Sequence, residues 1–254
     1  KNNRFNNGTT AAGNFDGAAV FDVQDTAVAT SEFETRHNFT FGLDFSEKFF
    51  GDYATQFGVA FFASEGTPYS FTFNSPSTLA YGAGNSGAVR FTDEQSGAGQ
   101  LLYVPTGVND PNVVYANGTA TQPTAAQTRD QLNAYVENDA CLSRYRGRSI
   151  ARNTCRNDWY YDLDLRVSQQ LPGPGRLFGV EDKIRVYADF DNFMNLLDSA
   201  WNLRRSRGST IPVVTGGVDA QGRYVYSNFN PNDDNDVTTS ASLWRVQVGV
   251  SYSF

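Results

Sequence analysis

Residues 244–254 read WRVQVGVSYSF. Apolar side chains occupy every second position of this stretch: Trp244, Val246, Val248, Val250, Tyr252 and Phe254. Because successive side chains of a β-strand point to opposite faces, the alternation predicts a strand with one apolar face and one polar face. Strands of this kind occur in soluble β-sandwiches and in transmembrane β-barrels, so the rest of the chain must distinguish the two.

The same alternation recurs along the chain. Predicted strands cover residues 37–46, 53–73, 158–171, 182–193 and 243–254. The segment 53–73 keeps its alternation past Pro68, and as one strand of 21 residues (73 − 53 + 1) it would be about 70 Å long. In 158–171 and 182–193 the polar partners are largely charged. We therefore expect an all-β fold.

Composition excludes several classes of protein. Aromatic residues are frequent, with 20 Phe, 13 Tyr and 3 Trp, and only 19% of the 254 residues are charged. No stretch reaches the roughly 18 consecutive apolar residues of a transmembrane helix, but the mean hydropathy of −0.45 suits the alternating strands of a transmembrane β-barrel. The net charge of −7 offers no basic surface, so we expect no nucleic-acid partner.

The connections between the predicted strands alternate in length. Those at 47–52 and 172–181 are short, whereas those at 74–157 and about 206–240 are long. Outer-membrane barrels join their strands by short periplasmic turns and long outer loops, so the alternation favours an antiparallel transmembrane β-barrel segment with long extracellular loops. A capping-box pattern at 124–127 predicts a short helix within the first long loop.

Short motifs follow one another along residues 30–254. They are EGTPYSFTF (65–73), LLYVP (101–105), QLNAYV (131–136), YRG (145–147) with RN (152–153), DLDLR (162–166), DFDNFMNLL (189–197) and the closing stretch 244–254. Their order and spacing resemble the C-terminal β-barrel of TonB-dependent outer-membrane receptors, in particular the Oar-like branch with a carboxypeptidase-regulatory-like N-terminal domain. The resemblance implies a barrel of about 22 strands with an N-terminal plug, energised through the TonB system.

About five strands cannot close such a barrel, and residues 1–254 contain no plug domain or TonB-box-like start. The chain is therefore interpreted as the C-terminal part of a longer receptor. We expect it in the outer membrane of a Gram-negative cell, with its loops outside and its C-terminus in the periplasm. The expected partners are the outer membrane with its lipopolysaccharide, the plug and remaining strands of the same receptor, the TonB system and, as an option, a surface lipoprotein.

The predicted function is energised uptake of a bulky ligand through a plugged barrel. The alternative is a structural or adhesive surface protein whose barrel anchors ligand-binding or cell-binding loops. A soluble secreted β-sandwich is a third interpretation, which the loop asymmetry and the family motifs disfavour. The sequence does not identify the ligand.

Two sets of candidate residues follow from the predicted strands. Charged partners should face the lumen if the apolar partners face lipid: Asp162, Asp164, Arg166, Arg185, Tyr187, Asp189 and Asp191. Cross-strand ion pairing on a polar wall is their favoured role, and lining a ligand path or touching the plug is the functional alternative. Aromatic residues near strand ends are expected at the membrane interface: Trp159, Tyr160, Trp201, Trp244 and Tyr252. The closing strand supplies the candidate barrel-assembly signal: Val246, Val248, Val250, Tyr252 and Phe254.

The two cysteines, Cys141 and Cys155, lie close together in a polar stretch. This favours a loop disulfide in an oxidising compartment over a metal site. With His37 as the only histidine, a zinc site is disfavoured.

No catalytic residues are predicted, and we expect no enzyme. A Ser-His-Asp centre would have to recruit His37, and residues 84–87 lack the Gly-x-Ser-x-Gly pattern. No cofactor is expected. Asp233, Asp234 and Asp236 could bind Ca²⁺, but a solvated acidic run is the favoured interpretation.

Overall fold

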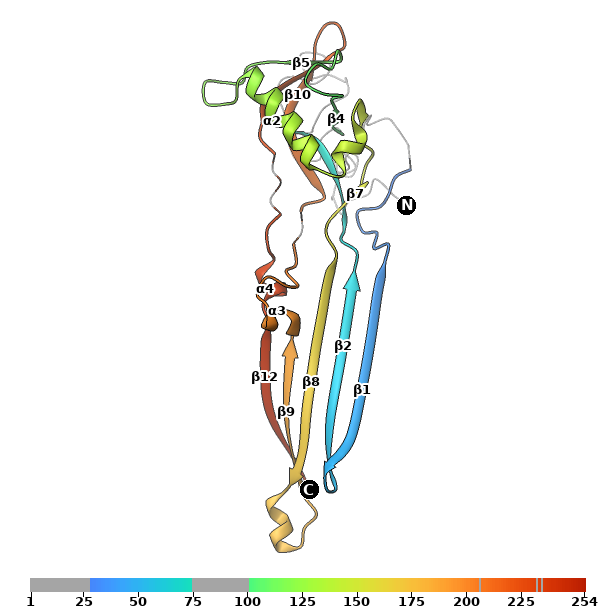
Figure 1. Ribbon diagram of the computed structural model, residues 1–254, viewed down its shortest axis with the longest axis vertical. Coiled ribbons are helices and arrows are strands. Elements are labelled where there is room, and N and C mark those ends of the chain that lie inside the picture. Colours follow the sequence, from blue (N-terminus) through green and yellow to red (C-terminus); the bar gives the residue numbers. More distant parts are fainter. Residues whose placement is uncertain (1–27, 75–100, 206, 232, 234) are drawn as a thin grey trace, which may run out of the picture. The chain divides into compact units, whose positions relative to one another are not determined.

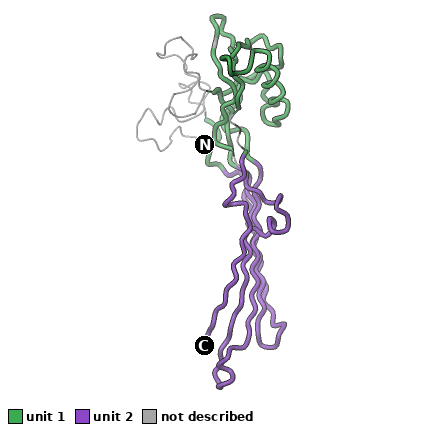
Figure 2. Tube along the Cα trace, turned by 90° about the vertical axis from the view of Figure 1, so that its left-hand side faces the viewer, with its two compact units in different colours: residues 1–34, 67–157, 207–235 green, residues 35–66, 158–206, 236–254 purple. Residues whose placement is uncertain are grey.

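The computed structural model of the protein describes residues 28–74, 101–205, 207–231, 233 and 235–254. Over these residues the structure is mostly β-sheet with few helices, which agrees with the all-β prediction. The chain divides into two compact units (Figure 2). Unit 1 contains residues 1–34, 67–157 and 207–235, and unit 2 contains residues 35–66, 158–206 and 236–254.

Unit 2 is built on one five-stranded antiparallel sheet (Figure 1). Its strands are, in spatial order, β1 (Asn38–Phe50), β2 (Tyr53–Ser64), β8 (Tyr160–Pro172), β9 (Lys183–Asp191) and β12 (Arg245–Ser253). Spatial order follows chain order, so each strand pairs with the previous and the next strand of the unit. The segments predicted at 37–46, 158–171, 182–193 and 243–254 overlap β1, β8, β9 and β12.

The connections of this sheet are asymmetric. Because all its pairs are antiparallel, the β1–β2 turn and the β8–β9 turn lie at one end of the sheet, here called the short-turn end. The β2–β8 and β9–β12 connections leave from the other end, here called the long-connection end. The tight β1–β2 turn uses Gly51 at φ +64°, a left-handed conformation that glycine adopts without steric cost.

The prediction of one continuous strand over 53–73 is wrong. The segment splits into β2, which ends at Ser64, and β3 (Pro68–Asn74), and the two strands belong to different sheets. Pro68 has no N–H to donate to a ladder, and it begins β3 opposite Arg156. The alternation of apolar residues therefore continues past Pro68, although the strand ends before it and a strand of another sheet begins at it.

Unit 1 contains a second five-stranded sheet, in the order β5-β11-β10-β3-β7, and a two-stranded sheet, β4-β6. Besides β3, its strands are β4 (Tyr103–Val104), β5 (Val113–Tyr115), β6 (Arg148–Ser149), β7 (Cys155–Arg156), β10 (Thr210–Val218) and β11 (Tyr224–Phe229). The pairs β3–β10 and β5–β11 are parallel. Each pair joins the β2–β8 connection, here called the first insertion, to the β9–β12 connection, here called the second insertion. The five-stranded sheet of unit 1 is therefore assembled from both insertions.

Unit 1 has a hydrophobic core. Its fully buried members include Phe71, Phe73, Leu102, Leu132, Val136, Ile211 and Tyr226. Leu132 and Val136 come from α2 (Ala125–Asn138), whose predicted capping box is confirmed by hydrogen bonds between Thr124 and Gln127 in both directions. Among the described residues of unit 2, by contrast, Ala63 is the only buried apolar residue.

The remaining helices are short. They are η1 (Leu142–Tyr145) in unit 1, and η2 (Pro174–Phe178), α3 (Phe193–Leu197) and α4 (Thr239–Ser242) in unit 2. No helix in the described part of the chain is long and apolar enough to cross a membrane.

Candidate functional site

The register of the unit 2 sheet separates its side chains by polarity. Directly paired residues share a face of a sheet. One row of pairs crosses all five strands and is apolar throughout: Leu43, Val59, Leu165, Phe190 and Val246. The adjacent row points to the opposite face and is polar or glycine: Asp44, Gly58, Arg166, Asp189 and Gln247. We call these two surfaces the apolar face and the charged face.

The apolar face is most exposed on the outer strands β1 and β12, and many of its side chains on the central strands are half-buried. Besides the row above, it carries Phe39, Phe41, Phe45, Phe57, Phe61, Tyr161, Leu163, Val167, Ile184, Val186, Val248, Val250 and Tyr252. Val248 and Val250 are 69% and 67% exposed, values typical of surface lysines rather than valines. Every alternate position of the predicted assembly strand, from Val246 to Tyr252, therefore points to this face.

The charged face collects all the predicted lumen-facing residues. Alternate positions of β8 and β9 put Asp162, Asp164 and Arg166 on the same side of the sheet as Arg185, Tyr187, Asp189 and Asp191. At its centre Arg166 Nε lies 3.3 Å from Asp189 Oδ1, and its guanidinium lies 5.1 Å from the centre of the Tyr187 ring. Cross-strand ion pairing, the favoured role of these residues, is therefore present at one pair.

A shallow hollow of about 280 Å³ lies on the charged face beside Arg166. Its polar lining comes from Asp44, Ser46, Gln56, Arg166 and Ser168. Gly58 also lines it, and a Cβ at that position would lie 3.1 Å from Asp44 Oδ1. The hollow can hold water or a small polar group, and it contains no pair of groups suited to acid–base catalysis.

An acidic cluster lies on the charged face at the long-connection end. The Tyr160 hydroxyl donates to Asp162 Oδ2 at 3.2 Å, and Asp164 Oδ1 accepts the Asn192 N–H at 2.9 Å. The Arg204 guanidinium lies 5.4 Å from the centre of the Tyr160 ring. Tyr160, predicted at the membrane interface because it lies near a strand end, shares the charged face with Asp162, since it stands an even number of residues from it on β8.

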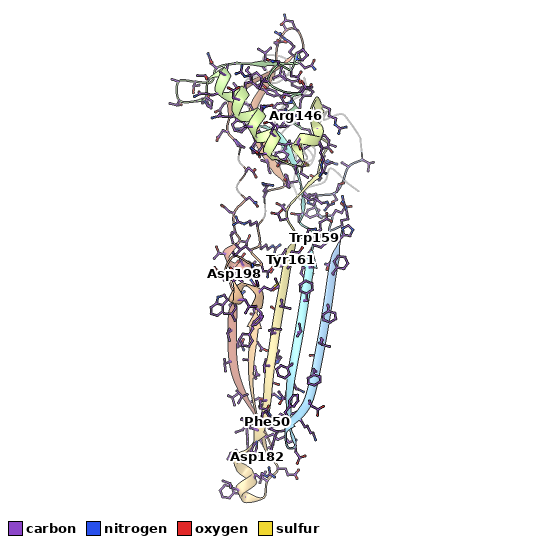
Figure 3. The ribbon with its side chains drawn as sticks, viewed as in Figure 1. Phe50, Arg146, Trp159, Tyr161, Asp182 and Asp198 are labelled. Atoms are coloured by element: carbon purple, nitrogen blue, oxygen red, sulfur yellow. A yellow bond between two sulfur atoms is a disulfide. The ribbon has the colours of Figure 1, made fainter. Side chains whose placement is uncertain are left out.

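The other predicted interface aromatics are exposed and lie near strand ends. Trp159 stacks near Phe39 and Tyr161, with ring centres 6.1 and 6.2 Å away, and so extends the apolar face at the long-connection end. Figure 3 shows Trp159 and Tyr161 at the end of the sheet opposite Phe50 and Asp182. Trp201 and Trp244 are exposed near the long-connection end, and Tyr252 lies at the short-turn end.

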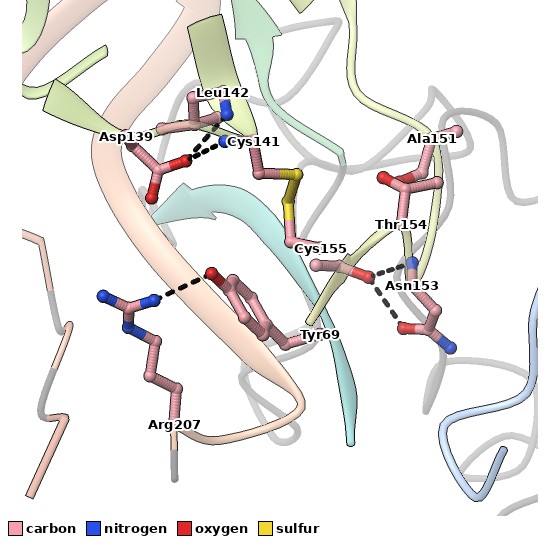
Figure 4. Close-up of a disulfide and its surroundings, with 10 residues drawn as sticks. Tyr69, Asp139, Cys141, Leu142, Ala151, Asn153, Thr154, Cys155 and Arg207 are labelled. Carbon is pink, nitrogen blue, oxygen red and sulfur yellow. Dashed lines mark hydrogen bonds between the residues drawn. A yellow bond between two sulfur atoms is a disulfide. The ribbon is translucent and has the colours of Figure 1, made fainter. Parts of the chain in front are cut away.

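Unit 1 contains a separate polar network around Arg207. The Arg207 guanidinium donates to the Tyr69 hydroxyl at 2.8 Å (Figure 4). It also forms an ion pair with Asp233. Asp233 Oδ2 also accepts the Tyr135 hydroxyl at 2.8 Å, and burial together with this carboxylate raises the pKa of Tyr135 well above its usual value. The network joins α2, β3 and the end of the second insertion.

This network bears on the calcium prediction. Asp233 is already bound by Arg207 and Tyr135, and Asp236 is exposed in unit 2. Asp234, like residues 84–87, lies outside the described residues. Over the part of the chain that is described, no group of three or more His, Cys, Asp or Glu side chains is arranged to hold a metal ion.

The two cysteines form a disulfide, with Cα atoms 5.7 Å apart. The bond joins the residue preceding η1 to β7, which pairs with β3 through Cys155 and Tyr69. Nearby, the Asn153 N–H donates to the Ser70 hydroxyl at 2.8 Å (Figure 4). The bond therefore joins η1 to β7, and the pairing of β7 with β3 brings this end of the first insertion to its beginning.

Sequence reasoning missed the polar group at the short-turn end. There Asp182 Oδ2 accepts the Tyr252 hydroxyl at 2.8 Å and the Gly175 N–H at 2.6 Å. Arg176 Nη1 donates to the Tyr53 hydroxyl on β2. The sequence does contain a turn signal here, Pro172-Gly173-Pro174-Gly175, and Asp182 follows later, just before β9.

Comparisons of the chain with protein-family models, with curated proteins and with solved structures found no match.

Proposed function

We propose that unit 2 is a section of the wall of a TonB-dependent outer-membrane receptor, with its apolar face in lipid and its charged face toward a water-filled lumen. The receptor takes up a bulky ligand with energy supplied through the TonB system. The observation that carries the proposal is the apolar face: five adjoining strands present apolar side chains that no part of their own unit covers.

Energetics support a hydrocarbon environment for this face. Burying one large aliphatic or aromatic side chain contributes about 1.5–3 kcal/mol. In water, the sheet would gain little of this burial energy at exposed positions such as Phe41, Leu43, Val248 and Val250. A contiguous apolar patch of this extent is also rare on monomeric soluble proteins. A bilayer supplies the missing apolar surroundings along the whole face.

Strand length supports the same environment. The five strands contain 13, 12, 13, 9 and 9 residues. A tilted strand needs about 9–11 residues to cross the hydrocarbon core of a bilayer. Each strand of unit 2 is long enough.

The open edges of the sheet support a larger barrel. Within the described residues, β1 pairs only with β2, and β12 pairs only with β9. An unpaired edge is untenable in hydrocarbon, because its N–H and C=O groups find no water. Further strands must continue the sheet on both sides, as in a barrel of about 22 strands that encloses a plugged lumen.

The charged face supports a water-filled interior. Arg166 and Asp189 form an ion pair at the centre of the sheet, and Asp162 and Asp164 lie together nearer the long-connection end. Such groups are costly in lipid but ordinary on the inner wall of a large barrel. The acidic cluster would be met by a ligand or a plug entering from the outer side.

A second candidate function is a structural or adhesive surface protein. The observation that favours it is unit 1, which has its own hydrophobic core and a disulfide although it is made of connections between strands. A folded module of this kind is suited to binding a protein or a cell surface.

The experiment is to measure the intact mass of the mature protein in the outer-membrane fraction, by gel with and without heating and by N-terminal sequencing. The receptor proposal expects a heat-modifiable species of about 100 kDa, the size of about 22 strands plus a plug, with a TonB box near its start. A heat-modifiable barrel without plug or TonB box would favour the adhesive protein. A species that stays soluble without detergent would refute both.

A further inference from the structure

The β8–β9 turn exposes two large apolar side chains at the short-turn end. Leu177 and Phe178, the last residues of η2, are 86% and 84% exposed. They belong to unit 2 and extend beyond the last residues that pair β8 with β9, Pro172 and Lys183. An exposed Leu-Phe pair in a surface turn needs an explanation, because turn tips are ordinarily polar.

Hydrogen bonds hold this turn in one conformation. The Asp182 carboxylate accepts the N–H of Gly175 at 2.6 Å and the N–H of Arg176 at 3.1 Å. The backbone carbonyl of Asp182 accepts the Gly173 N–H at 3.1 Å. A Cβ at residue 173 would lie 2.2 Å from Asp182 Cγ, so glycine is required for this close approach. The exposure of Leu177 and Phe178 is therefore a property of a defined turn.

Two tyrosines place the turn on the apolar side of the sheet. Tyr252, on the apolar face of β12, donates to the Asp182 carboxylate at 2.8 Å. Tyr53 stands at an alternate position from Phe57, hence also on the apolar side, and it accepts a hydrogen bond from Arg176. The turn is thus attached on the same side of the sheet as the apolar face, and Leu177 and Phe178 extend that face past the strand ends.

We propose that the β8–β9 turn is a membrane anchor, in which Leu177 and Phe178 enter the boundary between headgroups and acyl chains of the leaflet at the short-turn end. The inference rests on the proposed function, because it takes the apolar face to be in lipid. Continuity with that face identifies the occupant: a bilayer that covers Val248 and Val250 also reaches the side of the sheet to which the turn is tied.

The surrounding polar groups match the headgroup layer. Arg176 is exposed and precedes Leu177 directly, so one cation lies beside the apolar pair and can contact lipid phosphates. Tyr53 and Tyr252 lie at the same level, with aromatic rings toward the apolar face and hydroxyls bound to polar groups. Such amphipathic rings concentrate at membrane interfaces.

The test measures the depth of three sites in the full-length protein. Leu177→Cys, Val248→Cys and Gln221→Cys are each labelled with the fluorophore NBD without reductant, which leaves the Cys141–Cys155 disulfide intact. The labelled proteins are then folded into vesicles of phosphatidylethanolamine and phosphatidylglycerol that contain lipids brominated near the headgroup or near the acyl-chain end. Iodide in the buffer reports exposure to water. Phe178→Cys repeats the turn measurement from the adjacent residue.

The expected result is quenching at 177 and 178 by the shallow bromolipid with protection from iodide, quenching at 248 by the deep bromolipid, and quenching at 221 by iodide alone. If 248 is quenched by the deep bromolipid while 177 and 178 are quenched by iodide alone, the anchor is refuted and the embedded sheet stands. If 177, 178 and 248 are all quenched only by iodide, the proposed function and the anchor both fail. If 248 is quenched only by iodide while 177 and 178 are quenched by bromolipid, the proposed function fails, and the turn binds the membrane although the sheet lies outside the bilayer.

Discussion

The ring of Tyr187 lies against the backbone of Gly249 on the neighbouring strand. The two residues are directly paired between β9 and β12, and a Cβ at residue 249 would lie 2.3 Å from Tyr187 Cζ. The Arg166 guanidinium lies 5.1 Å from the centre of the same ring and also pairs with Asp189. Gly249 thus makes room for a Tyr187 ring that contacts the ion pair between β8 and β9.

Replacement of Gly249 by valine should therefore destabilise the sheet. The Tyr187 ring must leave its position over residue 249 and lose its contact with Arg166, at a cost of about 1–3 kcal/mol. The free energy of unfolding in urea, measured in detergent micelles, reports the loss. Ser251→Val, two residues along the same face, is the matched control and should change stability much less. Equal losses for the two variants would contradict the role given to Gly249.

Arginine substitutions on adjacent residues distinguish the two faces of β12. Val248→Arg puts a cation on the apolar face and should destabilise the protein in lipid vesicles by about 2–4 kcal/mol. Gln247→Arg puts the same side chain on the charged face opposite Asp189 and should be tolerated. The fraction that migrates as a folded species on an unheated gel measures the difference. Tolerance of both substitutions would argue against lipid on the apolar face.

Removal of the disulfide should weaken unit 1. The bond closes a loop with a sequence separation of 14, for which the loss is about 3 kcal/mol. Cys141→Ser combined with Cys155→Ser leaves no free thiol, and its urea unfolding should match that of the reduced unmodified protein. The double variant should not respond to reductant, whereas a response would show that the reductant acts elsewhere.

Acid should weaken unit 1 through Asp110. Burial opposes ionisation of this carboxyl, but hydrogen bonds from the N–H groups of Thr106 and Asn112 and from the Tyr103 hydroxyl outweigh it and hold its pKa below the ordinary value of 3.8. The unfolded chain therefore takes up the proton first as the pH falls. The contribution is complete above pH 3.8 and lost as the pH falls through the lower value of the folded state.

Asp110→Asn tests this contribution. The amide keeps one acceptor oxygen, but its NH₂ group would face N–H or O–H donors that now bind the carboxylate. About 1–3 kcal/mol of stability should therefore be lost at neutral pH. As the pH falls below 3.8, the stability of the variant should fall less steeply than that of the unmodified protein. Parallel acid curves for the two proteins would contradict the assignment.

The unit 2 sheet could be predicted because its signal is local. Alternation of apolar and polar residues identifies a strand from its own residues, and chain order gives the pairing of β1, β2, β8, β9 and β12. The same reasoning failed at Pro68, where alternation runs on although the strand leaves its sheet. Nearness to a strand end, the basis for placing Tyr160 among the interface aromatics, does not specify a face of the sheet.

Unit 1 could not be predicted in the same way. Its central pairing, β3 with β10, joins residues far apart in sequence. The local pattern of a strand does not specify which distant strand it pairs with. The β10–β11 hairpin was missed, although Ile211 and Val213 before Asp219 and Gly222, and Tyr226 after them, carry a hairpin signal. The network of Arg207, Asp233 and Tyr135 depends on that hairpin being in place.

The parallel pairing of β3 with β10 also sets an order for biosynthesis. The ribosome releases β3 before β8, β9 and β10 have been made, so β3 must wait without the strand that becomes its neighbour in the middle of the unit 1 sheet. During that interval Phe71 and Phe73, which are buried in the folded unit, are accessible to chaperones and proteases. A nascent chain halted before Thr210 would carry four of the five unit 2 strands but no β10, which makes it a natural target for quality control.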